Sequence, residues 1–129
     1  MAKQFVVQLK NEPGAMANLA EALAARGVDL RAIGGGSMGD SGHVIMTTAD
    51  DPATKAVLDD GGYNYIEGES ILTEVDDRPG GMARLSRALA DAGVNILGHL
   101  FLGRWGDRAM FAFVVDKPDI ARPILERKG

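Results

Sequence analysis

The chain has 129 residues, of which 46% are hydrophobic and 25% charged, so it is not a disordered protein and fits one ordinary domain or two minimal ones. A formal net charge of −4, without any Lys/Arg run, argues against a nucleic-acid-binding surface, and the absence of cysteine excludes disulfides, thiolate metal sites and cysteine nucleophiles. No apolar run is long enough for a signal peptide or a membrane span, so we expect a cytoplasmic protein.

The first half of the chain predicts alternating strands and helices. Val and Phe dominate a short strand that stops at Asn-Glu-Pro-Gly, and apolar residues then recur at i, i+3, i+4, i+7 and i+8, which is typical of an amphipathic helix. Gly27 ends this helix as a left-handed cap. The expected elements are a strand at 3–10, a helix after Pro13-Gly14, strands at 28–35 and 43–49 around a turn at 39–42, a helix from Asp50 and a strand at 63–69.

The second half repeats this pattern. Residues 13–63 align with 79–129 at a constant offset of 66 without a gap, and most identical pairs fall in the segment from the Pro-Gly pair to Gly-Val. The second copy is expected to contain a strand at 71–76, a helix closed by Gly93, strands at 94–104 and 109–116, and a helix from Asp116. We interpret the chain as a duplicated unit, with boundaries at 1–70 and 71–129.

The order of elements predicts an α+β fold, with two ferredoxin-like βαββαβ units in tandem and helices on one face of each antiparallel sheet. The second unit lacks its last strand in this alignment, so strand 71–76 is expected to be an open edge, to be covered by the other copy or by a second chain. Pro123 falls inside the last helix and is expected to shorten or kink it.

Both copies contain the pattern strand, Asn/Asp-x-Pro-Gly, helix, Gly-Val-Asp/Asn, strand. This pattern resembles the ACT domain, the amino-acid-sensing module attached to many biosynthetic enzymes. The resemblance covers nearly the whole chain, as a tandem pair with no enzyme attached. It implies that a ligand binds at an interface between paired units, held by the loop after the first strand and by the start of the second strand.

The resemblance also implies which residues bind the ligand. The expected contacts are the polar residue two before each proline and the polar residue after each Gly-Val. The residue before the proline also suits turn capping. The residue after Gly-Val also suits a strand end that faces water. Leu9 and Val75 stand where some amino-acid-binding members present a histidine. The expected ligand-binding residues are Asn11, Glu12, Pro13, Gly14, Ala15, Met16, Asp29 and Leu30 in the first unit, and Asp77, Arg78, Pro79, Gly80, Gly81, Met82, Asn95 and Ile96 in the second.

Elementary chemistry supports such a site. Backbone N–H groups at a helix start favour a carboxylate, and the glycines beside them allow a close approach. A side chain such as Asp29 or Asp77 can accept hydrogen bonds from an ammonium group. Met16 and Met82 begin the apolar stripes, so they also suit the core.

The glycine-rich segment and the two histidines do not predict a phosphate-binding, metal-binding or catalytic site. The segment 34–42, GGGSMGDSG, lacks the Gly-Lys-Ser/Thr ending of a phosphate loop and is interpreted as a flexible hairpin. His43 and His99 occupy unrelated places in the two copies, and no spacing predicts a metal site, a cofactor or a catalytic group. The central strands lack the aromatic residues of an RNA-recognition fold.

The sequence therefore predicts a non-catalytic regulatory protein, a homodimer that binds an amino acid or related metabolite between ACT-like units and acts on an enzyme. No nucleic acid and no membrane are expected as partners. A pure assembly module without a ligand stays open as the alternative.

Overall fold

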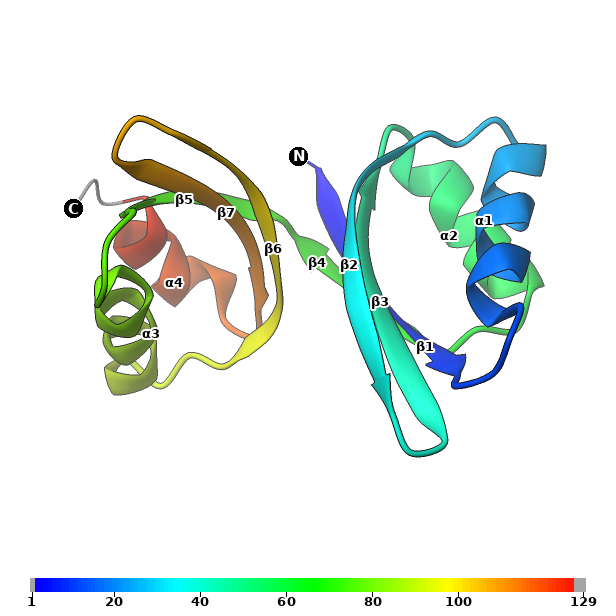
Figure 1. The fold of residues 1–129 in the computed structure, drawn as a ribbon, viewed down its shortest axis with the longest axis horizontal. Helices are drawn as coiled ribbons and strands as arrows, with labels where there is room; N and C mark the ends of the chain where they lie inside the picture. The colour runs from blue at the N-terminus through cyan, green and yellow to red at the C-terminus, as the bar shows by residue number, and fades with distance from the viewer. Residues whose placement is uncertain (1, 127–129) are drawn as a thin grey trace. The chain divides into compact units, whose positions relative to one another are not determined.

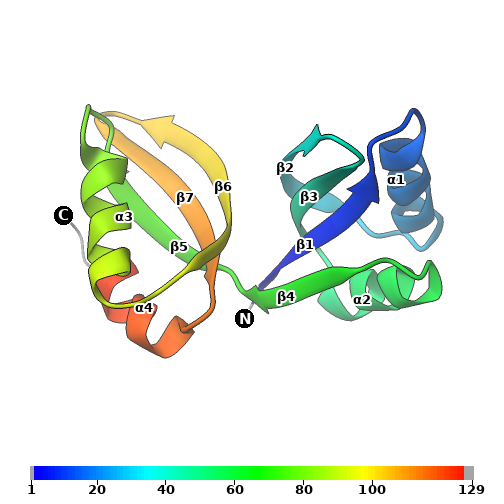
Figure 2. The same ribbon diagram turned by 90° about the horizontal axis from the view of Figure 1, so that it is seen from below.

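The computed structural model describes residues 2–126, and the chain divides into two compact units, Ala2–Glu67 and a second that begins at Gly68. Each unit consists of one sheet with two helices on one face (Figure 1). The view in Figure 2 shows the same layering in both units. The predicted α+β fold of two ferredoxin-like units is confirmed. The sequence-based boundary after residue 70 follows the strand β4 (Tyr65–Glu69).

The first unit has the order β2-β3-β1-β4 in its sheet. The strand β1 pairs antiparallel with β3, and β3 with β2. The backbone N–H of Gln8 donates to the carbonyl of Asn64 at 2.9 Å, just before β4. Besides β4, the elements of this unit are β1 (Lys3–Lys10), α1 (Ala15–Ala25), β2 (Leu30–Met38), β3 (Ser41–Thr48) and α2 (Asp51–Asp60).

One hydrophobic core lies between the sheet and the helices of the first unit. Phe5 and Leu19 are fully buried, and Tyr63 and Tyr65 pack against the cluster from the fourth-strand side. The remaining buried residues of this core are Val7, Leu23, Val28, Val44, Met46, Val57 and Leu58. The alternation of Phe5 and Val7 on β1 with exposed or half-buried neighbours is the period of two that a sheet covered on one face requires.

The second unit has a three-stranded sheet in the order β5-β7-β6 within the described residues. The predicted strand 71–76 is confirmed as β5 and lies at the edge of this sheet. The elements of the second unit are β5 (Ile71–Asp76), α3 (Gly81–Asp91), β6 (Ile96–Trp105), β7 (Arg108–Val115) and α4 (Pro118–Leu125). Its own core consists of Ile71, Leu89, Val94, Phe113, Val115, Ala121 and Leu125.

The sequence suggested that the two copies align without a gap. The structure shows that the alignment needs a gap of one residue. The ladder between β6 and β7 shifts register between Phe101 and Gly103, which leaves Leu102 as an extra residue. Beyond this bulge the equivalent positions differ by 67 rather than 66: the buried Leu58 of α2 corresponds to the buried Leu125 of α4. A bulge absorbs one residue without disturbing the core, which is why the sequence identities alone hid it.

Glycines in the left-handed region bound the first helix of each unit. Gly27 and Gly93, at φ 68° and 75°, follow α1 and α3 as predicted. Gly14 and Gly80, at φ 89° and 92°, precede these helices, so each helix begins directly after the Pro-Gly pair. The Asp50 side chain caps α2 by accepting from the backbone N–H of Ala53 at 3.0 Å. Helix α4 contains Pro123, as expected, and spans eight residues.

Candidate functional site

The loop between β1 and α1 is tied to the tip of the β2–β3 hairpin. The backbone N–H of Asn11 donates to the carbonyl of Asp40 at 3.1 Å. Its side-chain Nδ2 donates to the carbonyl of Gly39 at 2.9 Å. This bond orients the amide group, whose other polar atom, Oδ1, is a hydrogen-bond acceptor. The loop that the sequence singled out is therefore anchored at its first residue, and Glu12, Pro13 and Gly14 follow it on the exposed surface.

A hollow of about 280 Å³ opens between this loop and β2. Asn11 and Glu12 line it from the loop, Ala15 and Met16 from the start of α1, and Gly34–Gly36 from the strand. Four of the eight residues predicted for the first unit are thus brought together around one cavity. Small-molecule sites are concave, with mixed apolar and polar walls of this kind.

The glycine run in β2 leaves room for this hollow. A Cβ at Gly35 would stand 2.1 Å from the carbonyl oxygen of His43, so no other residue fits that backbone. Because this stretch carries no side chain, β2 leaves space beside Ala15 and Met16. The expected hairpin at 34–42 is confirmed, but its role as a wall of the candidate site was missed. Three consecutive glycines inside a strand were the available signal.

A second hollow, of about 570 Å³, lies on the other side of the same loop. It shares Leu9, Lys10, Glu12 and Ala15 with the first hollow and is completed by the segment 61–64, which leads into β4. The loop 10–15 thus separates two concave surfaces of the first unit. Ala15 borders both.

Met16 is 37% exposed, so its expected role in the core is wrong. It lies on the second position of α1, beside the hollow and beyond the part of the helix that covers the sheet, where Leu19 and Leu23 are buried. Its counterpart Met82 is half-buried and packs against the second core, as expected. Equivalent sequence positions therefore have different surroundings in the two units.

The remaining residues predicted for the first unit lie elsewhere. Asp29 and Leu30 stand at the start of β2, where Leu30 pairs with Thr48, whereas the loop lies at the hairpin end of the same strand. The exposed Asp29 carboxylate is 3.6 Å from the Nε of Arg31. Within the unit, Asn11 and Asp29 are thus at opposite ends of β2.

The second unit repeats this separation. The backbone N–H of Asn95, just before β6 and Ile96, donates to Oδ1 of Asp116 at 2.9 Å. At the other end of the sheet the backbone N–H of Asp77 donates to the carbonyl of Asp107 at 2.8 Å. Arg78, Pro79 and Gly80 follow on the exposed loop, and Gly81 and Met82 begin α3.

Arginines surround the loop of the second unit. The Nε of Arg104 lies 2.8 Å from Oδ2 of Asp77. The carboxylate of Asp76 pairs with Arg108 at 2.5 Å, with Arg78 at 3.2 Å and with Arg84 at 3.6 Å. The first unit has Lys10, Glu12 and Asn18 where Asp76, Arg78 and Arg84 stand, so the two loops differ in charge pattern.

A further hollow of about 420 Å³ lies beside β5, with Val75, Leu85, Ala88 and Ile124 as apolar walls and Arg84 at its rim. Of the ligand-binding residues predicted for the second unit, Gly81 lines this hollow. It corresponds to the larger hollow of the first unit.

The helices α1 and α3 begin without a side-chain cap and without an acidic residue in the first turn. The N-terminal backbone N–H groups of a helix lack intrahelical acceptors. Both helix starts are therefore able to donate to a carboxylate, as the sequence suggested.

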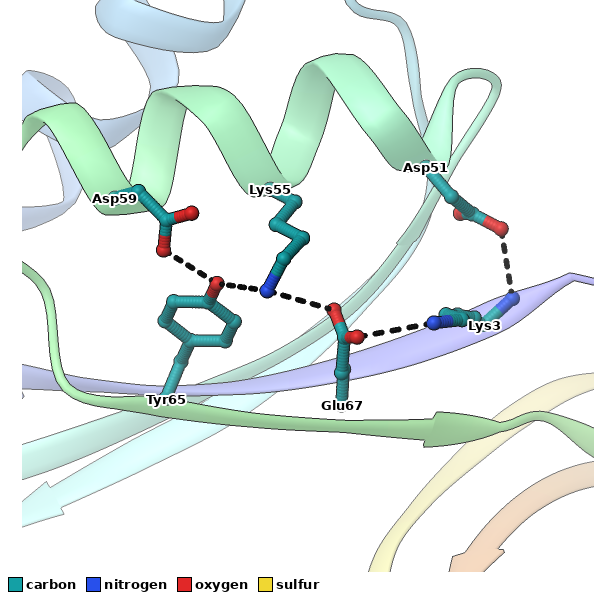
Figure 3. Close-up of polar contacts among 6 residues, drawn as sticks. All are labelled: Lys3, Asp51, Lys55, Asp59, Tyr65 and Glu67. Carbon is teal, nitrogen blue, oxygen red and sulfur yellow. Dashed lines mark hydrogen bonds and ion pairs between the residues drawn. The ribbon is translucent and has the colours of Figure 1, made fainter.

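The densest polar network of the first unit holds β4 against β1 and α2 (Figure 3). The hydroxyl of Tyr65 donates to Asp59 at 2.6 Å and accepts from Nζ of Lys55 at 3.0 Å, while Lys3 donates to Glu67 at 2.9 Å. The hydrogen bond that Lys55 donates to Tyr65, and then the charge of Glu67, raise the pKa of Lys55. The network joins three elements through the half-buried Tyr65 and Glu67, and we assign it to the attachment of the fourth strand.

The residues that the structure describes contain no group of three or more His, Asp or Glu side chains placed to hold a metal ion. His43 and His99 are both exposed, on β3 and β6. Within the same residues, no helix is long and apolar enough to cross a bilayer.

The fold and the hollows define a tandem α+β protein with small concave sites next to its Pro-Gly loops. The family model of the ACT domain matches residues 70–126. The first unit has the same order of its first five elements and adds a fourth strand. No curated protein matches the sequence.

Solved structures share this fold over nearly the whole chain. A protein from Bacteroides thetaiotaomicron is 21% identical, with a TM-score of 0.73 over 96% of this chain and 85% of that one. The ligand-free regulatory subunit of aspartate kinase from Thermus thermophilus is 20% identical, with a TM-score of 0.60 over 96% and 89%. The corresponding subunit from Thermus flavus is 19% identical, with a TM-score of 0.59 over the same shares.

Proposed function

We propose that this chain is a non-catalytic regulatory protein of the cytoplasm that binds a small amino acid or related metabolite. The observation that carries the proposal is the hollow of about 280 Å³ between the loop at Asn11 and the glycine run of β2. Its size is close to the lower end of small-molecule pockets, which favours a ligand no larger than an amino acid. The match of the ACT domain model to residues 70–126 supports the same class of ligand.

The groups around the hollow match the parts of an amino acid. The uncapped start of α1 offers backbone N–H donors for the carboxylate. Glu12 and Oδ1 of Asn11 are acceptors for the ammonium, and Ala15 and Met16 supply apolar surface for a side chain. Binding would then favour one arrangement of a homodimer and transmit that preference to a partner enzyme.

The test compares two matched variants of the full chain. Ala15 borders both hollows of the first unit, whereas Ala17, two residues later on α1, is exposed and lines neither. We expect at least one common amino acid at millimolar concentration to raise the melting temperature. Ala15→Leu fills the cavity and should weaken that binding by about tenfold or more, measured by calorimetry, and Ala17→Leu should leave it unchanged.

A pure assembly module is the competing function, favoured by the edge strand β5, whose Leu72 is 57% exposed. It predicts a stable oligomer in size-exclusion chromatography with light scattering, and a melting temperature that no amino acid changes. That pair of results would contradict the sensor. An amino-acid-dependent shift that Ala15→Leu abolishes would contradict the pure assembly module.

A further inference from the structure

In the second unit, larger side chains stand at the positions that line the small hollow of the first. The strand registers fix the equivalence: Gly35 pairs with Val44, the fourth residue of β3, and Phe101 pairs with Phe111, the fourth residue of β7. Phe101 thus occupies the position of Gly35. By the same rule Arg104, opposite the second residue of β7, occupies the position of Ser37.

The loop residue is equivalent as well. Asn11 and Asp77 each follow the first strand of their unit, and each donates its backbone N–H to the hairpin tip. In the first unit the Asn11 amide bonds to the backbone of Gly39. In the second, the Asp77 carboxylate faces a cation of its own chain, because the Nε of Arg104 lies 2.8 Å from its Oδ2.

The side chains of Arg104 and Phe101, which replace Ser37 and Gly35 of the first unit, contact one another. The guanidinium of Arg104 lies over the ring of Phe101, with 4.8 Å between its Cζ and the ring centroid. Phe101 in turn packs edge-on against Phe111, with ring centroids 5.6 Å apart. A continuous chain of contacts runs from Asp77 through Arg104 and Phe101 to β7.

These contacts are of the kind that a bound amino acid would make. Its ammonium would pair with the Asp77 carboxylate, as the guanidinium of Arg104 does, and its apolar part would occupy the space that the Phe101 ring takes. An incoming ligand would replace one cation by another at Asp77, and it would also have to displace an aromatic contact. The net free energy of binding a ligand at this loop is therefore expected to be small.

We infer that the loop site of the second unit is occupied by the chain's own Phe101 and Arg104, and that the protein binds one ligand per chain, at the first unit. This inference rests on the proposed function and assigns its stoichiometry. The chain thus contains two copies of the loop, of which one, in the first unit, has an open ligand site.

The test converts the second unit to the pattern of the first. The double variant Phe101→Gly and Arg104→Ser restores the residues found at Gly35 and Ser37. The probe is the common amino acid that raises the melting temperature of the wild-type chain most, titrated by calorimetry. We expect one site per wild-type chain and two per double-variant chain, and Ala15→Leu should remove one site from each protein.

A second variant covers the case in which the double variant fails to fold. Asp77→Ala removes the half-buried carboxylate that pairs with Arg104 and should leave the stoichiometry and affinity of the wild-type chain unchanged. Two sites in the wild-type chain, or loss of binding in Asp77→Ala, would overturn this inference alone. Binding of no amino acid to either protein would overturn the proposed function and the inference together.

Discussion

Gly81 begins α3 at a point where the helix nearly touches the end of β5. A Cβ at this position would stand 2.3 Å from the backbone carbonyl oxygen of Asp76, a distance that real Cβ atoms do not adopt. The first unit has Ala15 at the equivalent position, so its loop holds the helix further from the strand. One methyl group is thus a steric difference between the starts of α1 and α3.

We expect Gly81→Ala to destabilise the protein by about 1–3 kcal/mol, because the helix start must move away from β5. The free energy of unfolding from urea titration measures this. Ala15→Gly is the matched control in the first unit, and should cost no more than about 1 kcal/mol through helix propensity. Equal effects of the two substitutions would contradict the steric argument.

At the scale of elements, the fourth strand of the first unit depends on side chains as well as on the ladder. Lys55 on α2 donates to Tyr65 and lies 3.9 Å from Glu67, and both of these residues belong to β4. At the offset of 67 that holds beyond the bulge, Arg122 of α4 is the residue equivalent to Lys55, and its guanidinium pairs with Glu69 at the end of β4 and with Asp119.

The raised pKa of Lys55 gives this attachment a pH dependence. A lysine whose folded pKa lies above its ordinary value of 10.5 contributes stability that is fully present below pH 10.5 and is lost as the pH rises through the folded value. We expect the difference in melting temperature between wild type and Lys55→Met to shrink as the pH is raised past 10.5. Lys10→Met, on β1 away from this network, is the control and should show no such convergence.

At the scale of the whole molecule, each unit has its own hydrophobic core. Leu23 of α1 and Leu89 of α3 are equivalent residues in the two clusters and both are buried. Because the buried residues of the two cores form separate clusters, we expect a cavity in one core to loosen that unit first.

Leu23→Ala tests this expectation. It should cost about 2–5 kcal/mol and lower hydrogen-exchange protection in the strands β1 and β3, measured by mass spectrometry, while β5 and β7 keep theirs. Leu89→Ala should give the reverse pattern. A uniform loss of protection in both units after either substitution would show that the chain unfolds as one cooperative body.

The order of the elements, the duplication and the place of the Pro-Gly loops could all be predicted from the sequence. These features depend on local chemistry: period-two and period-3.6 apolar patterns, and glycines such as Gly27 and Gly93 in left-handed caps. The sequence also identified Asn11, Glu12, Ala15 and Met16, which do line one hollow, because they are neighbours in the chain.

The tertiary structure was needed to show which side chains of β2 and β6 stand beside the two loops. The contact of Arg104 with Asp77 joins segments that lie far apart in the sequence, and the one-residue bulge at Leu102 sets which residues of β6 lie beside Phe101. Strand register determines such contacts, and a single inserted residue moves every later position by one. For the same reason Asp29 and Asn95, which follow the Gly-Val pairs, were found at the end of each sheet opposite the loops.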